Sequence, residues 1–461
     1  RATGGGGQRM SQYRAYPAYK DSGIEWIGQV PEHWQVKRLK HLISQCQNGV
    51  WGDDPLEDGS DTLCIRVADF DRDNNVVIYN PSTYRQITKE HQDSRLVSKG
   101  DILLEKSGGG AQTLVGANVR YLGEEPAVCS NFVAVIKPSK MAESAWLNYL
   151  MASMYALKIN LRSIKQSTGI QNLDSEQYLD EGVAAPSLDE QATIAAALDR
   201  ETARIDALVE KKTRFIELLK EKRQALITHA VTKGLDPNVN MKDSGVEWIG
   251  QVPEHWAIPA LKFLLSTPIT DGPHETPVPA EPQDGIVFIS AEAVSSGRIN
   301  FSKAWGYISR ADHKRYSRKY KPQQGDIYMV KSGATTGITA MVEDNREFNI
   351  WSPLAAIRAN SETAPKFLLY ALRSTEFQAG VALNWSYGTQ QNIGMNVLEN
   401  LPLPIPPYKE QATIAATLER ETARIDALIG KAEQSITLLK ERRSAFITAA
   451  VTGQIDLRGK Q

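Results

Sequence analysis

The chain is one large unit written twice, and this duplication restricts its fold more than any other feature. Residues 19–34 read YKDSGIEWIGQVPEHW and residues 241–256 read MKDSGVEWIGQVPEHW, with fourteen of sixteen positions identical. Residues 190–211 and 410–431 match at eighteen of twenty-two positions. Both pairs lie about 220 residues apart, which excludes a short-period solenoid and indicates two copies of a domain-sized unit.

Between the matched blocks the two copies diverge, and only short islands align. KGDILLEKSGG from Lys99 corresponds to QGDIYMVKSGA from Gln324, and STGIQNL from Ser167 corresponds to YGTQQNI from Tyr387. A retained frame around divergent inserts indicates two units with different ligand specificities. Ordinary drift after duplication, faster at surfaces, is the alternative.

Two stretches, 188–232 and 409–452, predict long helices because they are rich in Ala, Leu and charged residues and lack proline. We expect the two helices to pair antiparallel about a pseudo-two-fold axis, since neither can bury an apolar stripe alone; packing of each helix on its own domain is the alternative. Ser187 and Glu190 form a capping-box pattern at the first helix. Apolar residues at spacings of three, four or seven predict a heptad-like seam: Ile194, Leu198, Ile205, Leu208, Phe215, Leu219 and Leu226, then Ile414, Leu418, Ile425, Leu428, Leu439 and Phe446.

The divergent regions, 35–186 and 257–406, mix strand-like and helix-like segments. We therefore predict an α+β fold: two mixed α/β domains with mostly antiparallel, curved sheets, separated by the pair of long helices. The predicted strands are 62–67, 76–79, 102–105, 131–136, 286–290, 327–331 and 354–357, and the predicted helices are 146–159 and 366–383. The expected boundaries are 11–187, 188–233, 234–407 and 408–461, with the glycine-rich residues 1–10 expected to be an added sequence outside the fold.

Composition restricts the class of protein without identifying it. No run of about 18 apolar residues is present, so we expect no membrane span. The three cysteines are widely separated and odd in number, which favours a reducing cytoplasm over a disulfide framework. The net charge of −1 gives no general attraction to nucleic acid. A DNA-binding chain of this composition would hold DNA locally, or together with partner subunits.

Sequence motifs for catalysis are incomplete. Ile405-Pro406-Pro407-Tyr408 resembles the base-binding motif of amino-methyltransferases, but Ile405 cannot accept a hydrogen bond from an exocyclic amine. Asp101, Glu105 and Lys106 resemble a nuclease motif, but no residue separates the acid from the lysine and the second copy has Val330. No phosphate-binding G-x-x-x-x-G-K-[ST] loop is present, and His33 and His255 lack nearby ligands. We therefore predict no catalytic and no metal-binding residues.

Three features have the chemistry of DNA contacts. The Lys-Ser-Gly turns join backbone freedom to phosphate donors, with a plain hairpin turn as the alternative. The Thr/Gln loops carry amides that can pair with adenine, with a self-stabilised loop as the alternative. The segment 310–321, RADHKRYSRKYK, is basic with interleaved tyrosines, with a solvated helix face as the alternative. The candidate DNA-binding residues are Lys106, Ser107, Gly108, Gly109, Thr168, Gly169, Gln171, Arg315, Lys319, Lys331, Ser332, Gly333, Thr336, Thr389, Gln390 and Gln391.

The matched leaders at 21–34 and 243–256 and the E-Q-x-x-I-A-x-x-L blocks at 190–208 and 410–428 resemble the specificity subunits of type I restriction–modification enzymes (HsdS). The resemblance covers nearly the whole chain from about residue 13. It implies two target-recognition domains that each read one half of a bipartite double-stranded DNA site, with helices that set the half-site spacing. It also implies a non-catalytic chain in which the DNA contacts lie in loops of the variable domains.

The resemblance further implies partner subunits. Two methyltransferase subunits, which carry S-adenosylmethionine, would dock on the helices, and a translocase-nuclease would join for cleavage. A fused enzyme with its own active site and a pure protein-binding scaffold are the rival hypotheses. The candidate partner-docking residues are Glu190, Gln191, Glu201, Arg204, Glu410, Gln411, Glu421 and Arg424.

Overall fold

The computed structural model describes residues 14–109, 113–167, 169–384, 386–387 and 391–459. The chain divides into two compact units, the first made of residues 1–211 with 434–461 and the second of residues 212–433. Each long helix therefore contributes one half to each unit. This division differs from the predicted boundaries, which kept the helices apart from the domains, because each half-helix packs against a sheet domain and belongs to its core.

The matched leaders form matching hairpins. In the first unit β1 (Tyr19–Asp21) pairs antiparallel with β2 (Gln29–Pro31), and in the second β17 (Met241–Asp243) pairs with β18 (Gln251–Pro253). The carboxylates of Asp21 and Asp243 each accept a hydrogen bond from the glycine amide two residues later, at 2.9 Å. Such short-range bonds depend only on local sequence, so nearly identical sequences give the same hairpin twice.

The sheet domain of the first unit is mostly antiparallel, as predicted. Only the pairs β11–β7 and β12–β5 are parallel among the named strands of this unit that the structure describes. Its sheets follow the orders β4-β13-β9-β11-β7-β6, β12-β5-β8 and β16-β3. The strands are β3 (Gln35–Arg38), β4 (Ile43–Asn48), β5 (Thr62–Ile65), β6 (Phe70–Asp71), β7 (Val76–Val77), β8 (Tyr84–Arg85), β9 (Ile102–Glu105), β11 (Asn118–Arg120), β12 (Ala127–Cys129), β13 (Val133–Pro138) and β16 (Gly182–Ala185).

The second unit repeats this topology. Its order β19-β25-β22-β23 matches β4-β13-β9-β11, and its β20–β24 pair is parallel like β5–β12. The duplication inferred from the sequence is therefore also a duplication of strand order. The strands are β19 (Thr270–Asp271), β20 (Ile286–Ile289), β21 (Gly306–Ile308), β22 (Ile327–Val330), β23 (Thr339–Met341), β24 (Phe348–Ile350) and β25 (Leu354–Ile357).

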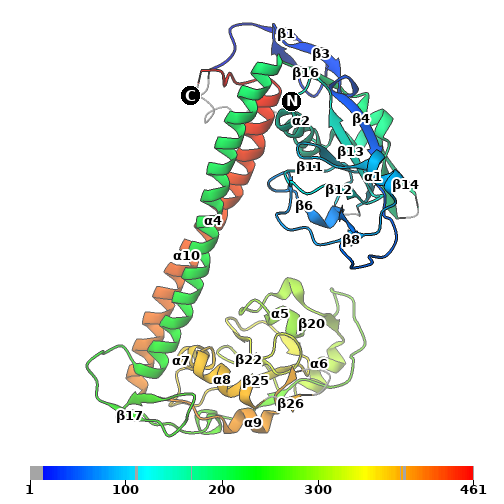
Figure 1. Ribbon diagram of the computed structural model, residues 1–461. Helices are drawn as coiled ribbons and strands as arrows, with labels where there is room; N and C mark the ends of the chain where they lie inside the picture. The colour runs from blue at the N-terminus through cyan, green and yellow to red at the C-terminus, as the bar shows by residue number, and fades with distance from the viewer. Residues whose placement is uncertain (1–13, 110–112, 168, 385, 388–390, 460–461) are drawn as a thin grey trace. The chain divides into compact units, whose positions relative to one another are not determined.

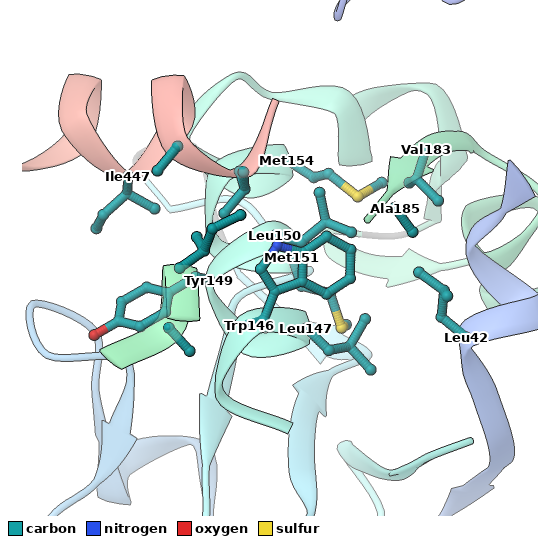
Figure 2. Close-up of a cluster of buried hydrophobic side chains, with 14 of the residues drawn as sticks. Leu42, Trp146, Leu147, Tyr149, Leu150, Met151, Met154, Val183, Ala185 and Ile447 are labelled. Atoms are coloured by element: carbon teal, nitrogen blue, oxygen red, sulfur yellow. The ribbon is translucent and has the colours of Figure 1, made fainter. Parts of the chain in front are cut away.

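A buried helix joins the sheet to the long helices in the first unit. Helix α2 (Ser144–Ala156) carries Trp146, Leu150 and Met154, which are all fully buried. Figure 2 shows them in one cluster with Met151 and Tyr149 of the same helix. Ile447 of the distal long helix belongs to the same core (Figure 2). The predicted helix 146–159 is thus confirmed in position and is a core element.

The matching region of the second unit differs from the prediction. The segment 366–383 forms two helices, α7 (Pro365–Leu372) and α8 (Thr375–Leu383), instead of one. The first helix ends at Leu372, with Arg373 as its C-cap, and Ser374 caps the second by accepting a hydrogen bond from the amide of Phe377 at 3.2 Å. The adjacent Arg373 donates to the carbonyls of Gly297 and Thr339 at 2.6 and 2.8 Å. These caps and tertiary bonds break a helix that periodicity alone would continue.

The two long helices are α4 (Leu188–Lys233) and α10 (Tyr408–Val451), within a residue of the predicted bounds (Figure 1). In the first unit Arg443 of α10 pairs with Asp206 of α4 at 3.0 Å, and in the second Arg223 of α4 pairs with Asp426 of α10 at 3.0 Å. Asp206 and Asp426 occupy matching positions of the repeat, as do Arg223 and Arg443. The helices therefore run antiparallel with the expected pseudo-two-fold register. None of the described helices combines the length and apolarity that crossing a membrane requires.

The predicted seam of α4 is correct at Ile194, Leu198, Ile205 and Leu219 and wrong at Leu208 and Phe215. Ile194 and Leu198 are fully buried, whereas Leu208 is 40% and Phe215 is 46% exposed. Ile216, one position later, is buried instead. A straight α-helix has 3.6 residues per turn, so a seven-residue template drifts off the buried face after a few turns.

Candidate nucleic-acid interface

In the first unit the turn after β9 meets the loop that contains the second sequence island. Strand β10 (Ser107–Gly108) pairs antiparallel with β15 (Ile170–Leu173). The Ser107 hydroxyl donates to the Asn172 amide oxygen at 2.6 Å, and the amide of Leu173 donates to the Lys106 carbonyl at 2.7 Å. Two islands that are far apart in the chain thus form one surface, a pairing that the sequence did not predict.

The second unit builds the same frame from the matching residues. Ser332 forms a bridge with Asn392, and the amide of Ile393 donates to the Lys331 carbonyl at 2.9 Å. The backbone amides of Lys106 and Lys331 each donate at 2.8 Å, to the carbonyls of Phe132 and Pro353. These shared bonds align the two sites residue by residue.

A glycine near each turn supports the alignment of the two sites. A Cβ at Gly49 would collide with the carbonyl of Cys129, and a Cβ at Gly272 would collide with that of Ile350. Both positions need glycine for the same close approach of two backbones. Asn48 and Asp271, the residues before these glycines, are therefore equivalent.

The two turn lysines differ in their partners. The Lys106 ammonium donates to the neutral amide oxygen of Asn48 at 2.7 Å. The Lys331 ammonium lies 3.4 Å from the carboxylate of Asp271, which is 1% exposed. Lys319 also pairs with this carboxylate at 2.6 Å, and His274 lies 3.0 Å from it. Burial alone would raise the pKa of Asp271, but the hydrogen bond from Lys319 and the nearby cations lower it below its ordinary value.

Glu105, considered above as part of a nuclease motif, has a structural partner. It is buried at the end of β9 and pairs with Arg72 at 2.8 Å. Burial raises the pKa of Glu105, and Arg72 offsets only part of this effect. Within the described residues no group of three or more His, Cys, Asp or Glu side chains is placed to hold a metal ion.

Several predicted contact residues have roles inside the domain. The prediction that Gln171 reads bases is wrong for this structure, because its side chain is 6% exposed and accepts a hydrogen bond from the amide of Val115 at 3.2 Å. Alternation along β15 turns Gln171 inward and Asn172 outward. Thr336 donates to the Gly333 carbonyl at 2.7 Å and shapes the second turn. Gly108, Gly109, Gly169 and Gly333 all have positive φ angles. Thr168, Thr389 and Gln390 lie outside the described residues, and Gln391 is described only as backbone of β27 (Gln391–Asn392).

The basic segment after Ser309 divides into paired and unpaired cations. Helix α6 (Arg310–Tyr316) directs Arg315 toward Asp312 and Glu275, at 2.7 and 2.6 Å. Lys319 pairs with Asp271, so Arg315 and Lys319, the two cations of this segment that we predicted to bind DNA, are both compensated by acids of the same domain. Three others, at steps of four residues, are exposed and take part in no ion pair of the described chain: Arg310, Lys314 and Arg318. We call these three residues the cationic row. The four-residue spacing of Arg310 and Lys314, which places them on one face of α6, is the sequence signal that could have found it; Arg318 lies just beyond the end of this helix.

The first unit lacks this cationic row. Its matching helix α1 (Lys89–Arg95) is capped by Thr88 as α6 is capped by Ser309. Counted from these caps, Lys89 corresponds to Arg310 and Asp93 to Lys314. The two domains thus present different charge at equivalent positions.

Half of the predicted docking residues hold the frame together instead. Gln191 and Gln411, both 1% exposed, accept hydrogen bonds from the amides of Glu143 and Ala364 at 2.8 Å. Glu190 accepts from Trp34 at 3.2 Å and pairs with His33 at 2.8 Å, and Glu410 repeats this with Trp256 and His255. The docking prediction is therefore wrong for the two glutamines, whose side chains are inaccessible. Ser187 does cap α4, with a 3.4 Å bond from the amide of Glu190, but the Glu190 side chain binds the leader.

The remaining docking candidates face outward to differing degrees. Arg204 and Arg424 are exposed, and Glu201 and Glu421 are half-buried. Arg204 lies 3.8 Å from Glu201 on the same helix. Their role in docking stays a prediction.

The sequence and fold were compared with known proteins. Residues 31–218 and 281–438 match the family model described as the type I restriction modification DNA specificity domain. The chain belongs to this family. As a specificity subunit of the type I restriction–modification (HsdS) kind, it is 24% identical over 444 residues to the MjaVIII specificity subunit of Methanocaldococcus jannaschii, covering 93% of this chain and 94% of that one. It is 23% identical to the EcoKI specificity subunit of Escherichia coli, over 79% of this chain and 76% of that one.

Solved structures share the fold of this specificity subunit. A chain solved in work on complex assembly and conformational transition of the type I R-M system superposes with a TM-score of 0.69 at 17% identity, covering 94% of this chain and 99% of that one. The HsdS subunit from Thermoanaerobacter tengcongensis gives a TM-score of 0.52 at 18% identity, covering 92% and 98%. The predicted family and fold class are confirmed.

Proposed function

We propose that each recognition domain reads one half of a bipartite double-stranded DNA target, and that the chain itself carries out no chemistry. The observation that carries this proposal is the repeated surface in which a Lys-Ser-Gly turn pairs with an Asn-containing strand, once with Asn172 and once with Asn392. Lysine and serine donate to phosphate, and glycine lets the backbone approach it. The same frame with different flanking side chains suits two half-sites of different sequence.

The cationic row strengthens the proposal for the second domain. Arg310, Lys314 and Arg318 are exposed, and each phosphate that they neutralise would release condensed counterions. Local rows of this kind explain how a chain with a net charge of −1 can bind DNA.

The proposal includes partner subunits. Two methyltransferase subunits, which would hold S-adenosylmethionine, dock on the long helices through exposed residues such as Arg204 and Arg424. A translocase-nuclease subunit joins for cleavage. Because catalysis is assigned to these partners, the acids of the incomplete nuclease motif can have structural roles in this chain. Glu105 pairs with Arg72, and Asp101 pairs with Lys137.

Footprinting of the chain with its methyltransferase partner on DNA selected from a random library tests the proposal. Two protected half-sites separated by a gap of unspecified sequence are expected. No sequence preference would favour a protein-binding scaffold, and methyl transfer by the purified chain alone would favour a fused enzyme.

A further inference from the structure

An apolar hollow of about 480 Å³ opens beside the Lys-Ser-Gly turn of the first unit. The residues that line it include two large aromatic side chains, Trp51 and Phe132, together with Val67, Ala68 and Gly108. Trp51 is 39% and Phe132 is 46% exposed. Exposed aromatics that line one hollow mark a binding surface more often than isolated exposed residues do.

The two aromatic residues are held in place by the frame of the turn. The carbonyl of Phe132 accepts hydrogen bonds from the amides of Lys106 and Ser107, at 2.8 and 3.2 Å. The guanidinium of Arg85 stacks over the Trp51 ring at 4.7 Å and donates to the Trp51 carbonyl at 3.3 Å. A preorganised apolar site loses little conformational freedom when its ligand arrives.

The polar groups around the hollow favour DNA as the source of the ligand. The hydrogen-bond partner of the Lys106 ammonium is the neutral amide of Asn48 rather than a carboxylate, so this lysine can meet a phosphate. Glu105, the acidic side chain in the lining, is paired with Arg72 and so is not available to a base amino group. An apolar hollow beside a phosphate-binding cation needs an apolar group on the DNA. In the major groove the C5-methyl of thymine is the one apolar group on the base edges.

We propose that Trp51 and Phe132 bind the C5-methyl group of a thymine in the half-site of the first domain. This inference rests on the proposed reading of DNA by that domain and adds the chemical group it recognises. The site discriminates thymine from cytosine and from uracil, which lack the methyl group.

The second unit is built differently at the equivalent positions. Pro353 takes the place of Phe132, as the matching bonds from the Lys331 and Lys106 amides show. Counted from the equivalent glycines Gly49 and Gly272, His274 takes the place of Trp51. The second unit therefore has neither Phe132 nor Trp51 at these two positions, although Trp351 stands where the first unit has Ser130.

Replacement of thymine by deoxyuridine tests the proposal, since it removes only the methyl group. After the target has been selected with the full chain and its methyltransferase partner, each thymine is replaced in turn and binding is measured by fluorescence anisotropy. One position in the first half-site should lose roughly four- to tenfold in affinity, as burial of one methyl group predicts. Phe132→Ala should bind the thymine target more weakly and respond no further to deoxyuridine.

Matched variants distinguish a failure of this inference from a failure of the proposed function. Phe132→Leu, which keeps an apolar wall, should retain the deoxyuridine effect, and Pro353→Ala in the second unit should leave it unchanged. A first half-site without an A·T pair, or equal deoxyuridine losses in wild type and Phe132→Ala, overturns the inference while two protected half-sites uphold the proposed function. An effect of base removal without one of methyl removal also overturns it, because the hollow would then hold an unstacked base. Absence of any sequence preference overturns both.

Discussion

The Lys-Ser-Gly turns of the two units share a backbone and differ in charge. Around Lys106 the frame supplies a neutral amide and two aromatic side chains, whereas around Lys331 it supplies a buried carboxylate shared with Lys319. The backbone bonds that fix each turn are the same. Duplication has therefore kept the backbone positions of the two turns and changed the chemistry around them, as the proposed reading of two unlike half-sites requires.

The largest expected effect concerns the frame that both units share. Glu190 accepts hydrogen bonds from Tyr16 and Trp34, pairs with His33 and lies 3.9 Å from Arg458, and its side chain is 7% exposed. Among the described residues, the Glu410 side chain contacts the matching His255 and Trp256, and it is 33% exposed. Removal of either leaves buried donors unsatisfied. We expect Glu190→Ala to destabilise its leader hairpin by about 3 kcal/mol, because it leaves the buried donors of Tyr16 and Trp34 unsatisfied. Glu410→Ala should cost about 2 kcal/mol, because it leaves the buried donor of Trp256 unsatisfied.

Native-state hydrogen exchange, read separately for residues 14–35 and 241–257, measures the two losses. Equal losses would mean that the Tyr16 bond and the Arg458 pair together add nothing to the first leader. The second leader of the Glu190→Ala variant is the internal control and should be unchanged.

The next effect concerns the turn lysines. Lys106→Ala removes a cation that no carboxylate neutralises, so we expect roughly a tenfold loss of DNA affinity, the size of one charged hydrogen bond. Lys331→Ala should cost about threefold, because the Lys331 ammonium is already paired with the Asp271 carboxylate at 3.4 Å and its side chain is 13% exposed. Each variant should weaken one half-site and leave the base preference at the other unchanged. Binding to targets with one half-site scrambled checks this, and equal loss of preference at both half-sites would contradict the modular picture.

A smaller effect separates the two capped helices. Lys314→Ala should lower the slope of log affinity against log salt by about 0.9, the value for one phosphate contact. The matched variant in the first unit, Asp93→Ala, removes a negative charge and should leave that slope the same or slightly steeper. Titrations at several salt concentrations give both slopes. An unchanged slope for Lys314→Ala would show that Lys314 faces solvent and contacts no phosphate.

The smallest effect concerns Asp271 and pH. Because the pKa of Asp271 is below its ordinary value of 3.8 in the folded chain, its pairing stabilises the second unit above that pH and is lost as the pH falls through the folded pKa. Asp271→Asn, which copies Asn48 of the first unit, should abolish this dependence. Thermal unfolding of wild type and variant is measured between about pH 2 and 7. The difference between their free energies of unfolding should shrink towards the acid end, by less than about 1.4 kcal/mol for each unit of pKa difference. A constant difference across this range would show that the pKa of Asp271 is the same in the folded and the unfolded chain.

The sequence predicted features that depend on short-range patterns. The bounds of α4 and α10 follow from composition and the absence of proline, and the strands Ile102–Glu105 and Leu354–Ile357 fall where the apolar runs placed them. The two leader hairpins repeat because their bonds lie within a few residues.

The candidate site was predicted in position more than in detail. The Lys-Ser-Gly islands do form equivalent turns, yet their pairing with Asn172 and Asn392 joins residues far apart in the chain. Gln171 was misassigned because the inward phase of β15 depends on its partner strand. Arg315 and Lys319 were chosen for their charge, and the acids that neutralise it come from other elements.

The sequence alone determined that this protein has two copies of one frame, two long helices and a place in the specificity-subunit family, because repeats and helix periodicity are written in consecutive residues. The tertiary structure alone decided which side chains of the frame are available to a ligand. Whether Lys106 or Lys319 carries an uncompensated charge, and whether Phe132 and Trp51 share one hollow, depends on which distant residues lie beside them. Burial and ion pairing are properties of neighbours in space, so the two units could be counted from the sequence, and their differences became visible only in the fold.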